Sequence, residues 1–503
     1  MNLKEMLEET VRRYPDKTAI SLDKRKLSFA ELDEASNKVA NALLKMGLRK
    51  GDRIAILLSN IPEYAAIYFG IVKTGAVAVP LDTRYTLSEL SSLFNNSQPR
   101  VVVSERPTLE PVVTALPQFK SVEQVIDVSS RYAGQFPTYQ EIMANSSAQR
   151  VDVTIEDKDI AHVAYTSGST GHPKGVVLSH GNLVAHAGSS VSRFEQTEKD
   201  VVILFALPLY HAFGLEVVLI SSFLKGSTVV ILPGLSISSL METIEKERVT
   251  ILMGVPYTFG LMVNWAEREG VKHDVSSLRF GVSGGSALPT DIARRFKEYY
   301  GRDLVQIWGL TEGIAQDTCQ AIDGSGKPGS CGKALVGWEV KIVDESGREL
   351  PPNEPGGVIV RGPMMTGFYG NPQATAETIK DGWLYTGDIG RLDEDGELFI
   401  LARKKDVIII KGQNIHPIDI EDVLYNHPSV AEAAVVGIDD ELRGERIKAF
   451  VGLTDGRVAT ERELKEFCRE YLARYKVPKE IIIMDSLPRT ATGKICKEDL
   501  KQL

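Results

Sequence analysis

The strongest chemical signal in the sequence is a run of glycine and hydroxyl-bearing residues from Tyr165 to Gly175, directly after the mostly apolar stretch 160–164. Glycines let the backbone approach an anion closely, hydroxyl groups offer donors, and Lys174 supplies a positive charge. The run therefore predicts a loop that cradles phosphate groups. It is not a Walker A loop, because Pro173 precedes Lys174 where that motif needs a glycine. A flexible loop without function is the alternative, and the ordered Pro-Lys-Gly ending argues against it.

Six further motifs follow this loop along the chain. They are Pro208–Gly214, with a P-x-x-H pattern, Gly281–Pro289, Trp308–Glu312, Tyr385–Asp388, Arg403–Glu421 and Pro488–Lys494. In this order they resemble the motifs of the adenylate-forming superfamily, which includes acyl-CoA synthetases, aryl-CoA ligases, adenylation domains and firefly luciferase. The resemblance extends from about Thr10 to Lys494 and is greatest to bacterial medium- and long-chain fatty acyl-CoA synthetases. Each motif alone is weak evidence, so the identification rests on the ordered set.

The resemblance implies an AMP-forming acid–CoA ligase that works in two steps. ATP adenylates a carboxylic acid and pyrophosphate leaves; CoA then takes the acyl group and AMP leaves, in a reaction that is reversible in principle. A carboxylic acid is already ionised at neutral pH, since its reference pKa is near ~4. Its attack on the α-phosphate therefore needs alignment and charge neutralisation rather than a general base.

Four residues are implied to act in catalysis. Glu312 would bind Mg²⁺ and Thr311 would contact the α-phosphate. Lys494 would bridge the substrate carboxylate and the phosphate as negative charge accumulates there. His211 would line the acyl pocket and help to organise the adenylation site. Taken singly, each has an ordinary alternative: a satisfied core histidine, a surface carboxylate or a solvated lysine near the chain end.

The ATP site is implied by the phosphate loop and by five of the other motifs. Asp388 would accept both ribose hydroxyls, Arg403 would add a donor there, and Trp308 would offer an aromatic face to adenine. The implied ATP-binding residues are Thr166, Ser167, Gly168, Ser169, Thr170, Gly171, Lys174, Gly284, Gly285, Ser286, Gln306, Trp308, Gly309, Thr311, Asp388, Arg403 and Lys494.

The acyl pocket is predicted to be apolar, which favours a hydrophobic chain or ring. Its expected lining is His211, Phe213, Gly214, Tyr257, Gly284, Gly309 and Ile314. The sequence leaves open whether the acid is fatty, aromatic or alicyclic. Glu216 interrupts the same apolar stretch, and two interpretations remain: a residue on a helix surface, or one that touches the pocket.

The second step is implied to use a mobile C-terminal domain. Lys405 falls at the hinge position of the resemblance, and the residues implied to lie near CoA are Lys411, Gly412, Arg443, Arg474 and Lys476. Two residues depart from the family pattern near the hinge: Ala402 stands for the usual glycine, and Asp419 for the usual glutamate. Both changes bear on the geometry of the hinge rather than on the reaction.

The elements that must position these residues alternate between helices and short apolar strands, which predicts an α/β fold with largely parallel, helix-covered sheets. Ser28 and Glu31 form a capping-box pattern that opens a helix ending near Gly47, and Pro62 opens another that ends near Gly75. Short strands after about Gly332 predict a small β subdomain. The chain beyond it predicts an α+β unit, with a strand at 433–436 and a helix at 460–475. The expected domains are an N-terminal adenylation domain 1–402, a hinge 403–406 and a mobile C-terminal domain 407–503 that carries the catalytic lysine.

Composition excludes several other classes of protein. The 503 residues are 43% hydrophobic and 25% charged, with a net charge of −9, which is typical of a soluble globular protein and gives no general attraction to nucleic acid. The first residues read neither as a signal peptide nor as a transit sequence, and the longest apolar region is interrupted by charges, so we expect a cytoplasmic protein without a transmembrane segment. The four cysteines are expected to be reduced thiols.

The expected co-substrates and cofactors are ATP, Mg²⁺ and coenzyme A, and the expected partners are small molecules, with a homodimer as one compatible assembly. Three alternatives remain open. They are an adenylation enzyme that loads a carrier protein in trans, a catalytically silent nucleotide sensor and, less favoured, an oxygenase of the luciferase type.

Overall fold

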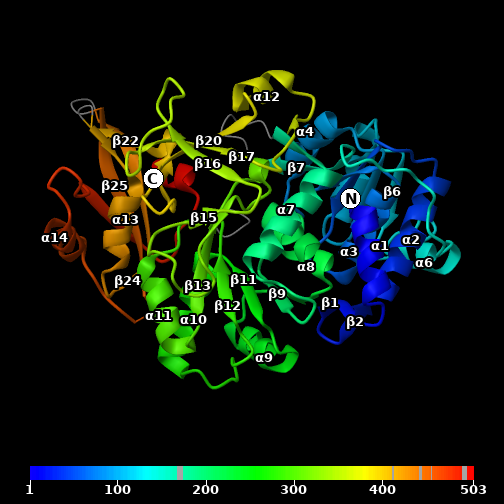
Figure 1. Cartoon of the computed structure of the whole chain (residues 1–503), viewed down its shortest axis with the longest axis horizontal. Helices are drawn as coiled ribbons and strands as arrows, with labels where there is room; N and C mark the ends of the chain where they lie inside the picture. The colour runs from blue at the N-terminus through cyan, green and yellow to red at the C-terminus, as the bar shows by residue number, and fades with distance from the viewer. Residues whose placement is uncertain (167–173, 411–412, 441–443, 455, 490–494) are drawn as a thin grey trace.

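The computed structural model describes residues 1–503 apart from 167–173, 411–412, 441–443, 455 and 490–494. A large N-terminal domain of sheets and helices makes up most of the molecule, and a smaller C-terminal domain, orange and red in Figure 1, packs against one side of it. This mixed α/β architecture confirms the predicted fold class.

One sheet of the N-terminal domain carries the strands on both sides of the predicted phosphate loop. Its order is β18 (Gly367–Phe368), β8 (Lys174–Ser179), β7 (Ile160–Thr166), β4 (Val77–Pro80), β3 (Arg53–Leu57), β5 (Val101–Ser104) and β6 (Gln124–Asp127). The strands from β7 to β6 run parallel, whereas β8 is antiparallel to β7. Buried apolar strands such as β3 and β5 are typical of a parallel sheet that is covered on both faces.

The other large sheet carries the predicted motifs Gly281–Pro289 and Trp308–Glu312 at the ends of two of its strands. Its order is β15 (Lys333–Ala334), β14 (Thr318–Cys319), β13 (Asp303–Trp308), β12 (Phe280–Ser283), β11 (Ile251–Gly254), β9 (Val201–Phe205), β10 (Thr228–Leu232), β1 (Thr18–Leu22) and β2 (Arg25–Ser28). Its central strands, from β13 to β1, are parallel. Trp308 therefore ends a strand at the carboxyl edge of a parallel sheet, which is where ligands bind in open α/β folds.

Helices cover both sheets, and their ends follow the signals in the sequence. They are α1 (Leu3–Arg13), α2 (Phe29–Lys45), α3 (Pro62–Lys73), α4 (Leu87–Ser97), α5 (Leu109–Ala115), α6 (Tyr139–Asn145), α7 (His180–Arg193), α8 (Ser221–Lys225), α9 (Ile237–Glu247), α10 (Pro256–Glu269), α11 (Thr290–Tyr300) and α12 (Pro372–Thr378). Ser28 and Glu31 form the predicted capping box of α2, and Pro62 begins α3. A π-helix at Phe213–Ile220, directly before α8, was not predicted.

The predicted β subdomain is an antiparallel sheet of short strands. Its members are β16 (Glu339–Val343), β17 (Gly356–Arg361), β20 (Trp383–Leu392), β19 (Ile379–Lys380) and β21 (Leu398–Arg403). Its long strand β20 pairs with β21, and this pairing sets Asp388 opposite Arg403.

The C-terminal domain folds around a sheet and a hydrophobic core of its own. The sheet contains β22 (Ile408–Ile410), β23 (Gln413–Ile415), β24 (Val430–Asp440), β25 (Gly444–Leu453) and β26 (Glu480–Met484), and the helices are α13 (Pro417–Tyr425), α14 (Glu461–Tyr471) and α15 (Lys497–Lys501). Two predicted bounds were wrong. The strand expected at 433–436 is the middle of the longer β24, and the helix expected to reach residue 475 ends at Tyr471 because Leu472 is extended.

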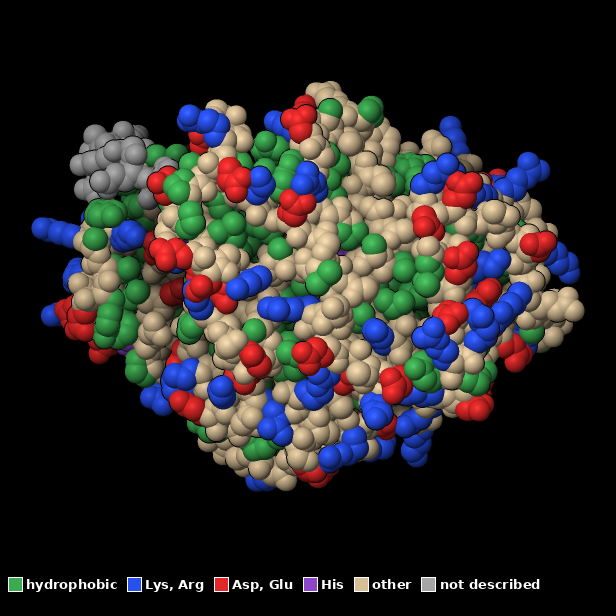
Figure 2. Space-filling view, in the orientation of Figure 1, with side chains coloured by type: hydrophobic (Ala, Val, Ile, Leu, Met, Phe, Trp, Pro, Cys, Tyr) green, Lys and Arg blue, Asp and Glu red, His purple; other side chains and the backbone are tan. Residues whose placement is uncertain are grey.

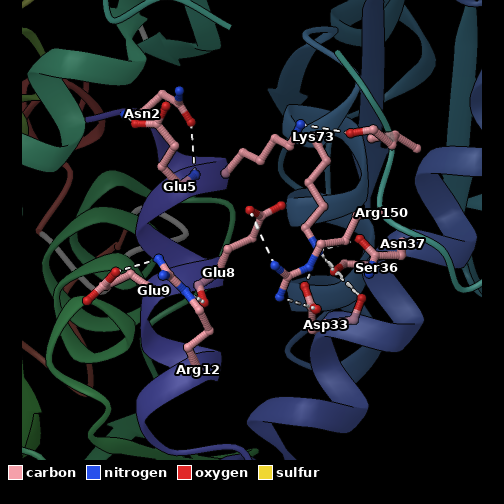
Figure 3. A network of polar contacts seen from close by, with 12 residues as sticks. Asn2, Glu5, Glu8, Glu9, Arg12, Asp33, Ser36, Asn37, Lys73 and Arg150 are labelled. Carbon is pink, nitrogen blue, oxygen red and sulfur yellow. Dashed lines mark hydrogen bonds and ion pairs between the residues drawn. The ribbon is translucent and has the colours of Figure 1, made fainter. Parts of the chain in front are cut away.

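A buried polar network joins the first three helices of the N-terminal domain (Figure 3). Lys73 of α3 is fully buried, and its Nζ lies 2.5 Å from Asp33 Oδ1, 2.6 Å from Ser36 Oγ and 2.8 Å from Asn37 Oδ1, all on α2. The guanidinium of Arg150 reaches between Asp33 and α1. Burial lowers the pKa of the Lys73 ammonium, while Asp33 opposes that shift. The oxygen acceptors around Lys73 compensate for removing its charge from water.

The surface carries charges of both signs, which are interspersed over the face shown in Figure 2. Cys319, Cys331, Cys468 and Cys496 are free thiols, as predicted. Within the described part of the chain, no helix is long and apolar enough to cross a membrane.

Candidate active site

A cavity of about 570 Å³ lies between the two domains. Its N-terminal wall comes from α10, the loop after β12, the end of β13 and strands β20 and β21. Its C-terminal wall comes from α13, β24, the segment after β26 and α15. The cavity brings together nine of the predicted site residues: Tyr257, Gly285, Ser286, Gln306, Trp308, Gly309, Asp388, Arg403 and Lys405.

Asp388 is a buried carboxylate at the cavity, with only 3% of its surface exposed. Trp308 Nε1 donates a hydrogen bond to its Oδ2 at 3.1 Å, and Arg403 Nε lies 2.8 Å from its Oδ1. The backbone NH of Asp388 donates to the hydroxyl of Thr386, which in turn donates to the Val358 carbonyl at 2.8 Å. An ionised carboxylate has about four lone-pair sites on its two oxygens, so a carboxylate fixed in this way can still accept hydroxyl groups of a ligand.

Thr311 and Glu312 lie on a single 3₁₀ turn, Thr311–Gly313, that follows β13. Gly309 allows this turn to fold back closely, because a Cβ there would lie 2.5 Å from the backbone of Ala315. Burial raises the pKa of the Glu312 carboxyl, while the positive charges of Arg403 and Lys174 lower it. The turn thus places one carboxylate within electrostatic reach of two predicted ATP-binding cations.

Two residues of the predicted phosphate loop, Thr166 and Lys174, flank the undescribed residues 167–173. Thr166 ends β7, Lys174 begins β8, and the two residues are paired across these strands. The Nζ atom of Lys174 lies 5.2 Å from the centre of the Phe368 ring. Ser167, Gly168, Ser169, Thr170 and Gly171 lie outside the described residues, as do Lys411, Gly412, Arg443 and Lys494.

Gln306 lines the cavity, but its side chain forms hydrogen bonds with two neighbouring segments of the protein. Its Nε2 donates to Cys331 Sγ at 3.2 Å, and its Oε1 accepts from the backbone NH of Leu288 at 3.4 Å. These contacts fix the loop that contains Gly285 and Ser286, both exposed to the cavity. We therefore infer that Gln306 supports this loop.

The predicted acyl-pocket residues fall into two groups. Tyr257 and Gly309 line the cavity, whereas His211, Phe213, Gly214, Gly284 and Ile314 are not on its described lining. The second group is closely packed. A Cβ at Gly284 would lie 3.0 Å from the Phe213 ring, and one at Gly214 would lie 2.2 Å from the Pro208 carbonyl oxygen. His211 Nδ1 accepts a hydrogen bond from the backbone NH of Phe213 at 3.3 Å.

Glu216 does not lie on the protein surface, so that interpretation of the sequence was wrong. It lies in the π-helix with only 2% of its surface exposed, and its Oε1 is 3.0 Å from His162 Nε2. The other ring nitrogen of His162 is 2.9 Å from the hydroxyl of Tyr68 on α3. This buried chain of contacts joins the helix after His211 to β7, the strand that leads into the phosphate loop. No local pattern in the sequence indicated it, because its members are far apart along the chain.

The predicted hinge and CoA residues lie at different places. Lys405 is in the 3₁₀ turn Lys404–Asp406, and its Nζ lies 3.1 Å from Glu498 Oε1 of α15. Arg474 is exposed after α14. Lys476 pairs with Asp419 at 2.6 Å, so the aspartate that departs from the family pattern has an ionic partner. Arg474 and Lys476 do not line the cavity.

The residues on both sides of positions 490–494 face the cavity. The backbone NH of Cys496 donates to the Pro488 carbonyl at 2.8 Å, and Arg489 forms a β-bridge with Ile495. Arg489 and Ile495 both line the cavity with Trp308 and Asp388. The strand β22, which precedes Lys411, presents the half-exposed side chain of Ile409 instead. The flanks of the predicted catalytic lysine, rather than β22, therefore contact the cavity.

Known proteins support the same assignment along the whole chain. Residues 7–369 match the model of the AMP-binding enzyme family, and residues 419–494 match that of the AMP-binding enzyme C-terminal domain. A long-chain-fatty-acid–CoA ligase of Bacillus subtilis (strain 168) is 33% identical, covering 99% of this chain and 94% of its own. A feruloyl-CoA synthase of Amycolatopsis sp is 35% identical, with 98% and 96% covered.

A solved structure extends the agreement to three dimensions. The anthranilate CoA ligase AuaEII in complex with anthranoyl-AMP superposes with a TM-score of 0.94 at 29% identity, covering 100% of this chain and 97% of that one. The sequence match and the shared fold agree with the grouping of Trp308, Asp388 and Arg403 at one cavity. The chain therefore belongs to the AMP-binding enzyme family, within the adenylate-forming superfamily, and is an AMP-forming acyl-CoA synthetase that uses ATP and CoA.

Proposed function

We propose that the enzyme adenylates a hydrophobic carboxylic acid at the interdomain cavity and then transfers the acyl group to CoA, releasing AMP and pyrophosphate. One observation carries the proposal: Asp388, Trp308 and Arg403 contact one another at the cavity that the flanks of Lys494 also line. The proposed domains are residues 1–402, a hinge at 403–406 and residues 407–503.

In the first step, a carboxylate oxygen of the acid attacks the α-phosphorus of ATP, and the bond to the β-phosphate oxygen breaks. Asp388 accepts the ribose hydroxyls, and Trp308 orients adenine. Thr311 and Arg403 lie beside the α-phosphate and the ribose, and Lys174 with the loop 166–171 holds the outer phosphates. Lys494 offsets the negative charge that develops between acid and phosphate. Alignment and charge neutralisation are what this reaction needs from a protein.

The residues present fit a magnesium ion that arrives with ATP. Mg²⁺ is commonly bound through one or two carboxylates plus substrate phosphates, rather than by a cage of protein ligands. Glu312 is one such carboxylate at the turn, and the described residues contain no cluster of three or more candidate ligands. When bound, the ion would neutralise phosphate charge, and Glu312 would hold it.

In the second step, the sulfur of CoA attacks the carbonyl carbon of the acyl-adenylate, and AMP leaves. We propose that Lys405 is the hinge for a rotation of the C-terminal domain between the steps, with Lys411 and Gly412 near the thiol. Arg443, Arg474 and Lys476 would then face the CoA nucleotide. The exposed guanidinium of Arg474 and the ammonium of Lys476 are suited to phosphate groups.

The apolar character of the predicted acyl side supports a hydrophobic acid. Phe213, Ile314 and Ile307 are buried apolar residues, and Phe213 and Ile307 both lie close to Gly284. A fatty acyl chain is the substrate class we propose first. The feruloyl and anthranilate ligases among the similar proteins make aromatic acids the alternative to test.

The test is release of AMP and pyrophosphate with ATP, Mg²⁺ and a panel of straight-chain, aromatic and alicyclic acids, each with and without CoA. CoA-dependent turnover on the straight-chain acids is expected. Turnover only on aromatic or alicyclic acids would overturn the proposed substrate class. Adenylate formation with no transfer to CoA would point to a carrier protein, and no reaction with any acid would favour a nucleotide sensor.

The role of Lys494 has a separate test. We expect Lys494→Ala to abolish adenylate formation and to spare thioester formation from a supplied acyl-adenylate. Arg462→Gln is the control, because Arg462 lies on the exposed face of α14 with 85% of its side chain exposed. Equal loss of both half-reactions in Lys494→Ala would contradict the assigned role.

A further inference from the structure

One contact between the domains joins a predicted acyl-pocket residue to the segment that carries the predicted catalytic lysine. The guanidinium carbon of Arg489 lies 4.0 Å from the centre of the Tyr257 ring. Tyr257 lies in the first turn of α10, directly after Pro256, and is therefore held by the N-terminal domain. An arginine over an aromatic face at this distance makes a favourable cation–π contact.

Arg489 is fixed from the side of the C-terminal domain as well. It forms an ion pair with Glu432 of β24, and both side chains are largely buried, at 21% and 16% exposed. Its backbone forms the bridge to Ile495, and the neighbouring Pro488 carbonyl accepts from the NH of Cys496. The position of Arg489 therefore sets where the two described flanks of residues 490–494 lie relative to Tyr257.

The contact is of a kind that a domain movement can break. The Tyr257 ring and the Glu432 carboxylate belong to different domains, so a rotation of the C-terminal domain would keep the ion pair and lose the ring contact. The contacts of Lys73 differ, because Asp33, Ser36 and Asn37 belong to the same domain as that ammonium.

We propose that Arg489 is a positioning residue for the adenylation step, which seats the C-terminal domain over the cavity by stacking on Tyr257. It acts in that step alone, because the contact exists only while the flanks of Lys494 face the cavity. The inference rests on the proposed function of Lys494. Because Tyr257 lines the acid site, its contact with Arg489 brings the C-terminal domain against the region where the acid binds.

The test measures the two half-reactions separately in the full-length enzyme. Adenylate formation is followed as pyrophosphate exchange into ATP with acid and no CoA, and transfer is followed from supplied acyl-adenylate and CoA. Loss of one cation–π contact predicts about a tenfold loss of adenylate formation in Arg489→Gln and in Tyr257→Leu. Transfer from acyl-adenylate should stay within about twofold of the unaltered enzyme in Arg489→Gln. Tyr257 also lines the acid site, so in Tyr257→Leu the loss of adenylate formation should exceed any loss of transfer.

Conservative variants separate positioning from a general loss of structure. Tyr257→Phe keeps the aromatic face and should lose less adenylate formation than Tyr257→Leu, and the double variant Arg489→Gln/Tyr257→Leu should be no worse than Tyr257→Leu alone. Arg462→Gln on α14 is the matched arginine control and should change neither half-reaction. Thermal melting checks that each variant is folded.

Three results would overturn the inference. They are an equal loss in both half-reactions, a loss in Tyr257→Phe as large as in Tyr257→Leu, or additive losses in the double variant. The outcome for Lys494→Ala tells the two proposals apart. If Lys494→Ala abolishes adenylation while the Arg489 and Tyr257 variants do not affect it, only this inference fails. If Lys494→Ala leaves adenylation intact, the proposed function of that lysine fails first.

Discussion

Lys73 and Arg489 are both cations held by protein groups, but the molecule holds them in different ways. Lys73 is fully buried among three oxygen acceptors of one helix, inside one domain. Arg489 lies at a cavity between domains, where its partners include a carboxylate and an aromatic ring. A buried charge must keep all its partners, because an uncompensated charge costs several kcal/mol in the interior. A charge beside a water-accessible cavity can exchange one partner for water, which is the property that a moving domain requires.

The largest expected effect on the free energy of unfolding is at Asp33. Asp33→Ala leaves the Lys73 ammonium buried without its ionic partner, and should lower the free energy of unfolding by about 4 kcal/mol. The measurement is urea unfolding followed by tryptophan fluorescence. All four tryptophans lie before residue 402, so the signal reports on the N-terminal domain.

A second variant shows whether the buried charge of Lys73 causes the loss of stability in Asp33→Ala. Asp33→Leu/Lys73→Met removes both charges and should recover much of the lost stability, because apolar residues of similar size can replace a buried ion pair. A double variant as unstable as Asp33→Ala would show that packing, and not the charge on Lys73, dominates at this site.

The next effect is at the pair His162 and Glu216. Glu216→Leu and His162→Leu each leave one buried polar partner without the other, and should each cost about 2 kcal/mol of unfolding free energy. The double variant should cost less than the sum of the two, since the partners contact each other at 3.0 Å. Strictly additive losses would mean that the contact contributes nothing beyond the packing of each side chain.

The contrast between local and distant contacts also explains what the sequence could predict. Helix starts depend on neighbouring residues, so the capping box at Ser28 and Glu31 and the proline start of α3 were predicted and are confirmed. The parallel sheets followed from buried apolar strands in the same way. The π-helix and the pairing of His162 with Glu216 were not predicted, because they depend on which strands become neighbours in the fold.

The residues of the candidate site show the same difference between local signals and distant contacts. Trp308, Asp388 and Arg403 were found through motifs, and the structure brings them into direct contact. Arg489 stood within the motif Pro488–Lys494 without an assigned role, and its contact with Tyr257 joins segments that nothing in the sequence links. For the predicted acyl pocket, the sequence indicated the apolar residues but not that Phe213 and Gly284 would be closely packed.

A smaller effect is expected at Asp422, on the cavity face of α13. Burial raises the pKa of its carboxyl to about 6, with Glu421 and Asp419 adding to the shift. Because this value exceeds the unfolded one of about 3.9, the folded state binds more protons between the two. Stability therefore falls as the pH rises from about 4 to about 6, and stays reduced above that.

Asp422→Asn removes this dependence. At pH 7.5 the variant should be more stable by about 1 kcal/mol, and at pH 4 the gain should vanish. Hydrogen exchange in peptides from α13 measures the change within the C-terminal domain. A gain of equal size at both pH values would show that the substitution acts through something other than the proton on Asp422.

The smallest effect is expected at the pair Lys405 and Glu498, at the proposed hinge. Both side chains are about half exposed, at 51% and 59%, so water already solvates the charges and their pairing contributes little. Glu498→Gln should change the free energy of unfolding by less than about 0.5 kcal/mol, and that difference should disappear in 1 M salt. Hydrogen exchange in peptides from α15 and the hinge provides the measurement. A loss as large as that expected for Asp33→Ala would show that this exposed pair, at the proposed hinge, contributes as much to stability as the buried partner of Lys73. With the small effect expected, the proposed seating of the C-terminal domain depends instead on contacts such as that of Arg489 with Tyr257.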